Sequence, residues 1–83
     1  MLNRHVDGEQ EEFARLRGKI VTLCDIEHFN KNMRILKEDA KKNGDTMLTA
    51  LYVWERACCP DLTTKSGWRE YVRVYKHEMS IEN

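Results

Sequence analysis

Cysteine and histidine are the side chains of this 83-residue chain best suited to metal or thiol chemistry, and it has three of each. Cys24 and His28 are four residues apart, and Cys58 and Cys59 are adjacent. Zinc takes four Cys or His ligands in a tetrahedral array, commonly as two closely spaced pairs. Adjacent helical residues point about 100° apart, which suits two ligands of one ion poorly. We therefore expect reduced, metal-free thiols and no cofactor.

Catalysis by a thiol is also disfavoured by the pattern around Cys59. This residue lies near the expected end of a helix, where the helix dipole raises the pKa of a thiol. No histidine lies close to it in the sequence to accept its proton. The chain has no Gly-rich phosphate loop and no recognisable Ser-His-Asp arrangement. We expect a protein that is not an enzyme.

A second group of side chains suits an anionic partner, because basic residues gather on one face of the last expected helix. They are Lys65, Arg69, Arg73, Lys76 and His77. Such cations can contact phosphates and base edges, or acidic residues of a protein. Glu70 and Glu78 interrupt the positive face, and 14 basic residues balance 14 acidic ones over the whole chain. A general polyanion binder usually has a basic excess. We expect a protein partner, with nucleic acid as the alternative.

Three apolar residues, Ile35, Val53 and Val74, fall outside the main apolar stripes of their expected helices. Surplus apolar surface on a small domain often marks a partner site. The partner in that case is another protein, including a second copy of this chain. A crowded core around the two tryptophans is the other explanation of these residues.

These side chains must be positioned by helices, because apolar residues recur at spacings of three and four. The first helix is expected over residues 9–24, although the strand-like run Ile20-Val21-Thr22 leaves a strand open for residues 18–24. Leu23 belongs to its expected apolar stripe. A second helix should follow the N-cap residue Asp25, bury Ile26 on its stripe, and run to about residue 43. Gly44 can then adopt the left-handed conformation that closes a helix.

The third helix is expected over residues 46–58, with Asp45 or Thr46 as its N-cap, and it is apolar over more than half its girth. Such a helix has neighbours on more than one side. Pro60 cannot continue it. Ser66 is expected to cap a fourth helix, whose apolar face is formed by Trp68, Tyr71, Val72, Tyr75 and Met79. Trp54 and Trp68 should both be largely buried and lie close together.

The expected fold is all-α, with about four helices packed as two antiparallel helical hairpins in one domain, residues 1–83. No apolar run approaches the roughly 20 residues of a membrane span. The N-terminal residues lack the apolar segment of a secretory signal. We therefore expect a soluble protein of the cytoplasm or nucleus, with reduced thiols.

The order of residues around Trp54 resembles a known helical repeat. Residues 50–57 read Ala-Leu-Tyr-Val-Trp-Glu-Arg-Ala, Pro60 follows, and Trp68 stands three residues before Tyr71. This order resembles the half-a-tetratricopeptide repeat, a helical hairpin of RNA-processing scaffolds. The second helix of that repeat commonly reads Ala, an aromatic residue, and then Glu-Arg-Ala. The resemblance implies a scaffold that binds other proteins and has no catalytic residues.

The resemblance covers residues 28–78 loosely and residues 50–75 best. The family prefers Phe-Glu six and seven residues after the second tryptophan, where this chain has Val74 and Tyr75. Solenoids generally need three or more repeats, and this chain holds about two. A compact four-helix domain with the same packing residues is the alternative.

Overall fold

The computed structural model describes the backbone of residues 2–79 and the side chains of residues 10–79. It consists of four helices: α1 (Leu2–Leu23), α2 (Ile26–Asn43), α3 (Met47–Arg56) and α4 (Lys65–Met79). There is no strand within residues 2–79, so the all-α prediction is confirmed. The stretch 18–24, for which a strand was left open, belongs to α1 as far as Leu23.

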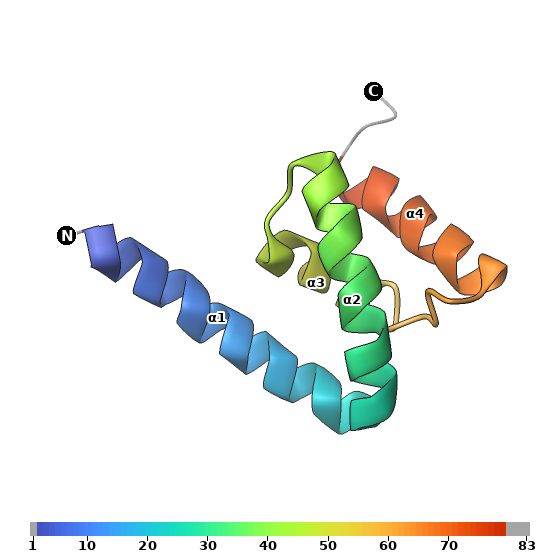
Figure 1. Ribbon diagram of the computed structural model, residues 1–83, viewed down its shortest axis with the longest axis horizontal. Helices are drawn as coiled ribbons and strands as arrows, with labels where there is room; N and C mark the ends of the chain where they lie inside the picture. The colour runs from blue at the N-terminus through green and yellow to red at the C-terminus, as the bar shows by residue number, and fades with distance from the viewer. Residues whose placement is uncertain (1, 80–83) are drawn as a thin grey trace.

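The short third helix lies at the centre of the molecule (Figure 1). It contacts α1, α2 and α4, which explains why its sequence is apolar around most of its girth. The N-terminal part of α1, in blue, extends away from the other helices (Figure 1). The molecule is only 18 Å thick along its shortest axis, which allows about two layers of helices. No helix of the described residues is long and apolar enough to cross a membrane.

The caps of α2 and α3 confirm what the sequence predicts. Asp25 accepts a hydrogen bond from the backbone N–H of His28 at 2.8 Å and thereby begins α2. Gly44 ends α2 with a φ of 73°, a left-handed conformation that glycine adopts without steric cost. Thr46 accepts from the N–H of Thr49 at 3.1 Å and begins α3.

The start of α4 differs from the prediction of Ser66 as its cap. The helix begins at Lys65, and Thr64 is the residue whose hydroxyl accepts a hydrogen bond from the N–H of Gly67, at 3.0 Å. Gly67 is buried against the preceding loop. A Cβ atom built on it would lie 2.0 Å from the backbone oxygen of Asp61. The absence of a side chain at Gly67 therefore lets α4 pack directly on the loop that leads into it.

The core is centred on Trp54, whose side chain is fully buried. Its ring stacks on His28 at a centroid distance of 5.8 Å and packs against Phe29 at 6.2 Å. The indole N–H donates to the backbone oxygen of Pro60 at 2.8 Å. Trp54 thus joins α3 to α2 and to the α3–α4 link.

Trp68 was predicted to lie beside Trp54, but the aromatic rings that pack against Trp54 are those of His28 and Phe29. Trp68 is only half-buried, and its ring packs against Tyr71 at a centroid distance of 5.7 Å. The reason is the rotation of α4 about its own axis. Gly67 and Tyr71, which are four residues apart, both face the interior, so Trp68 comes to the edge of the buried face.

Two residues predicted on buried stripes, Leu23 and Ile26, are also exposed. Their exposed fractions are 67% and 47%. They stand on either side of Asp25, where α1 ends and α2 begins, so they lie at the outer corner of that turn. Leu16 and Ile20, which belong to the same stripe of α1, are buried as predicted.

Candidate partner-binding groove on α4

The outer face of α4 carries an open groove of about 530 Å³. Its lining residues all come from this one helix, at spacings of three and four. They are Lys65, Trp68, Arg69, Val72, Arg73 and Lys76. Trp68 and Val72 are half-buried and form an apolar floor, whereas the basic residues are exposed and stand beside it. The structure therefore places four of the five predicted basic residues around one groove.

The charge along this groove is mostly unpaired. Arg73 donates to Glu70 at 2.5 Å, and this hydrogen bond lowers the pKa of the Glu70 carboxyl and raises that of Arg73. Lys65, Arg69 and Lys76 form no ion pair with any side chain among residues 10–79. The result is a strip of positive charge next to apolar surface on a chain whose net charge is zero.

The remaining predicted partner residues lie elsewhere. His77 is exposed but does not line the groove. Val53 is 3% exposed and belongs to the core, because α3 is surrounded by the three other helices. Ile35 and Val74 are half-buried and pack against the core. The sequence pattern misses Trp68 and Val72 as groove residues, because it assigns both to a buried face.

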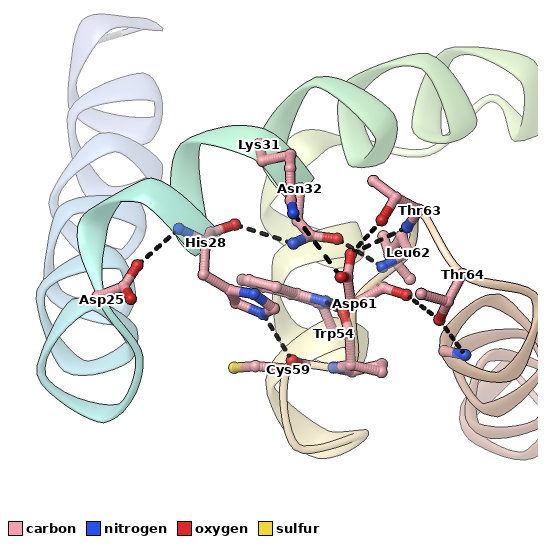
Figure 2. A network of polar contacts seen from close by, with 12 residues as sticks. Asp25, His28, Lys31, Asn32, Trp54, Cys59, Asp61, Leu62, Thr63 and Thr64 are labelled. Carbon is pink, nitrogen blue, oxygen red and sulfur yellow. Dashed lines mark hydrogen bonds and ion pairs between the residues drawn. The ribbon is translucent and has the colours of Figure 1, made fainter.

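Figure 2 shows a second group of polar side chains, which fixes the link between α3 and α4. Asn32 is fully buried. Its amide donates to the backbone oxygen of His28 at 2.9 Å, and its oxygen accepts from the N–H of Leu62 at 2.6 Å. His28 Nε2 lies 3.0 Å from the backbone oxygen of Cys59. These side chains satisfy backbone groups of the link, so their role here is structural.

Sequence reasoning overlooks Asn32, although the sequence contains a signal for it. Asn32 stands three residues after Phe29 and four before Leu36, which places it on the buried stripe of α2. A polar residue at such a position must find hydrogen-bond partners inside the protein. The partner here is a loop that packs against α2, which the periodicity of one helix does not reveal.

The three cysteines are free, and two of them lie together. Burial is the main cause that raises the pKa of Cys59 to about 12, and the thiol of Cys24 adds to the effect. Cys58 is exposed. Cys58 and Cys59 have φ values of 70° and 51°, a conformation that side chains other than glycine adopt at some cost. Within residues 10–79, no three His, Cys, Asp or Glu side chains gather closely enough to hold a metal ion.

We expect Cys58 to react first with iodoacetamide, because Cys24 and Cys59 are half-buried and burial raises the pKa of both thiols. Mass spectrometry after a short pulse at mildly alkaline pH should find the label on Cys58 alone. Unfolding in guanidinium should release all three thiols. In the control variant Cys58→Ser, the native protein should remain almost unlabelled. Labelling of Cys24 or Cys59 at the rate of Cys58 would contradict this arrangement.

Comparisons of the chain with protein-family models, curated proteins and solved structures found no match. The resemblance of residues 50–75 to half-a-tetratricopeptide repeats therefore stays a prediction. What the molecule does must be argued from its own surface.

Proposed function

We propose that this protein is a non-enzymatic binding module and that the groove on α4 holds a segment of another protein with acidic and apolar side chains. The observation that carries the proposal is the half-buried Trp68 between exposed cations. Apolar side chains of the partner would cover Trp68 and Val72. Its carboxylates would pair with Lys65, Arg69 and Lys76.

The dimensions of the groove suit a short helical or extended segment. Its lining residues run from position 65 to position 76, which corresponds to about 17 Å along a helix axis. Tryptophan and arginine are the residues that most often dominate binding at protein interfaces. Exposed cations at the edge of such a site mainly raise the association rate and select partners of opposite charge.

Nucleic acid remains the alternative ligand of the same groove. Trp68 is partly accessible beside lysine and arginine, and single-stranded nucleic acids bind to aromatic rings flanked by cations. The apolar floor and the neutral chain favour a protein segment. We also propose an intracellular location, because free thiols persist in a reducing compartment.

The triple variant Lys65→Glu, Arg69→Glu, Lys76→Glu should bind an acidic peptide at least about tenfold more weakly than the wild type. The probe is a 15-residue fluorescent peptide with Glu and Leu at helical spacing, followed by anisotropy. The melting temperature should change little, because exposed charges seldom contribute more than about 1 kcal/mol to stability. The control variant reverses three exposed cations of α2, which are Arg34, Lys37 and Lys41. It carries the same change in charge and should bind within about threefold of the wild type.

A second variant measures how much the apolar floor contributes to peptide binding, separately from the charged residues. Trp68→Ala should weaken peptide binding by about 30-fold, as expected of a central tryptophan. Because Trp68 is only half-buried, its loss should destabilise the fold by about 1–2 kcal/mol, less than the about 3–5 kcal/mol expected for a fully buried tryptophan.

A salt series distinguishes the two classes of ligand. Peptide binding that depends on apolar contacts should persist at about 0.5 M salt, whereas binding through phosphate contacts should fall steeply. Tight binding of a single-stranded oligonucleotide that the triple reversal abolishes, with no peptide binding, would replace the protein-partner proposal by the alternative. Equal effects of the α4 and α2 reversals would show that the groove is not the binding site.

A further inference from the structure

The first part of α1 is helical but extends away from the rest of the molecule. Figure 1 shows its end, in blue, on the opposite side from α4. The next part of α1 is attached to the body, because Tyr52 donates a hydrogen bond to Glu12 and Phe13 packs against the core. Glu11, the residue before them, is exposed. Residues 2–11 thus form a projecting helical segment, which we call the α1 arm.

A projecting helix of this length has little stability by itself. Isolated helices shorter than about 12–15 residues are marginal in water, and most helices in proteins are stabilised by packing on other elements. Among the described residues, α1 contacts α2 and α3 but not α4. Binding of the arm to a further surface would therefore stabilise its helix.

The sequence of the arm has the charge that the α4 groove is proposed to bind. Its acidic residues are Asp7, Glu9 and Glu11, and Arg4 is its one lysine or arginine. The groove has the opposite charge, because its lysines and Arg69 form no ion pair with any side chain among residues 10–79. Surfaces of opposite charge attract and orient each other during association.

The arm also matches the groove in its apolar residues and in its length. Leu2 and Val6 are four positions apart, and so are Trp68 and Val72 on the floor of the groove. On a helix this spacing places both residues of a pair on one face. The arm spans about 14 Å along its axis, against about 17 Å for the groove. One arm is therefore long enough to cover most of the groove.

The arm cannot fill the groove of its own chain. The two lie on opposite sides of the molecule, and α1 is attached to the body by α2 and α3, away from α4 (Figure 1). An arm that occupies a groove must therefore come from another molecule.

We propose that the α4 groove binds the α1 arm of a second copy of this chain, so that the protein associates with itself. The carboxylates of the arm pair with the groove cations, and its apolar residues cover Trp68 and Val72. Two copies that exchange arms form a closed dimer with twofold symmetry, the commonest kind of oligomer. Self-association of this kind rests on the proposed function, because the arm is a partner of the same groove.

Sedimentation velocity of the whole chain between about 1 and 500 µM tests the dimer. The dissociation constant should be about 10–100 µM, as expected of a small interface. The variant Glu9→Lys, Glu11→Lys should dimerise at least about tenfold more weakly. The matched control, Glu27→Lys, Glu38→Lys, reverses two exposed acidic residues of α2 and should dimerise within about threefold of the wild type. Circular dichroism should show the same fold for both variants.

A mixture of two variants tests the pairing of arm and groove directly. The groove variant Lys65→Glu, Arg69→Glu, Lys76→Glu has an acidic arm and an acidic groove, so it should not dimerise alone. The arm variant Glu9→Lys, Glu11→Lys has a basic groove and a more basic arm, so it should also remain a monomer. In an equimolar mixture each arm meets a groove of opposite charge. The mixed dimer should therefore form with an affinity within about tenfold of the wild type.

The fluorescent acidic peptide separates a failure of this inference from a failure of the proposed function. The arm variant should bind the peptide at least as tightly as the wild type, because its groove is unchanged. Peptide binding by a wild type that stays monomeric up to about 500 µM would overturn the arm as partner and leave the proposed function standing. Loss of both would overturn both. A dimer that the groove variant still forms alone would place the contact elsewhere and also overturn the inference.

Discussion

Gly67→Ala should destabilise the protein by about 3 kcal/mol or more. A Cβ atom at this position would lie 2.0 Å from the backbone oxygen of Asp61 and 2.7 Å from its carbonyl carbon. Both are backbone atoms, so relief requires α4 or the loop before it to move. Such a movement breaks the hydrogen bond from Gly67 to Thr64 and disturbs the buried Leu62. The melting temperature should fall by more than about 12 °C, measured by circular dichroism.

The matched control is Gly18→Ala. Gly18 is also inside a helix, but a Cβ atom there would have no neighbour within 4 Å. Alanine has the higher helix propensity, so this variant should be more stable by about 0.5–1 kcal/mol. The same substitution should therefore have opposite effects at the two positions. A stabilised Gly67→Ala variant would show that α4 does not pack on the loop as described.

Trp54→Ala should cost about 4 kcal/mol or more, which is about a third or more of the total stability of a domain of this length. The ring is fully buried and contacts His28 and Phe29, so its removal leaves a large cavity between α2 and α3. The backbone oxygen of Pro60 also loses its hydrogen-bond donor. A domain of this length has a total stability of only about 4–12 kcal/mol. Urea unfolding followed by circular dichroism measures the loss.

Trp54→Phe separates two contributions of this residue to stability, the packing of its aromatic ring and the hydrogen bond of its indole N–H to Pro60. Phenylalanine retains an aromatic ring in the core but has no N–H for the oxygen of Pro60. We expect an intermediate loss of about 1–3 kcal/mol. A melting temperature of Trp54→Ala within about 5 °C of the wild type would contradict the central position of this side chain. A Trp54→Phe variant as unstable as Trp54→Ala would assign the whole effect to the hydrogen bond.

Gly67→Ala and Trp54→Ala should also affect the groove. The reason is that Gly67 and Trp54 both contact the loop that holds α4 in place. Trp54 binds the oxygen of Pro60 at the start of this loop, and Gly67 packs on Asp61 within it. The rotation of α4 that brings Trp68 to the surface depends on these contacts. A partly folded variant should therefore lose peptide binding even though every groove residue is present.

The sequence by itself determined the elements that rest on local interactions. The helical periods, the caps at Asp25 and Thr46, and the left-handed Gly44 involve residues within about four positions of one another, and all were predictable. The basic residues of the groove were also found from the sequence, because their spacing on one helix follows from the helical period alone.

Tertiary structure alone decided how each helix is turned toward the others. The buried face of α4 follows from the contact of Gly67 with Asp61, and Asn32 is satisfied by Leu62, 30 residues away along the chain. An amphipathic stripe is wide enough to allow either Tyr71 or Trp68 at its centre, so its pattern does not fix the rotation. That choice made Trp68 part of a groove and left the buried hydroxyl of Tyr71 without a hydrogen-bond partner among the described residues. Contacts of α4 with residues outside that helix set both features, and the period of a single helix contains no information about them.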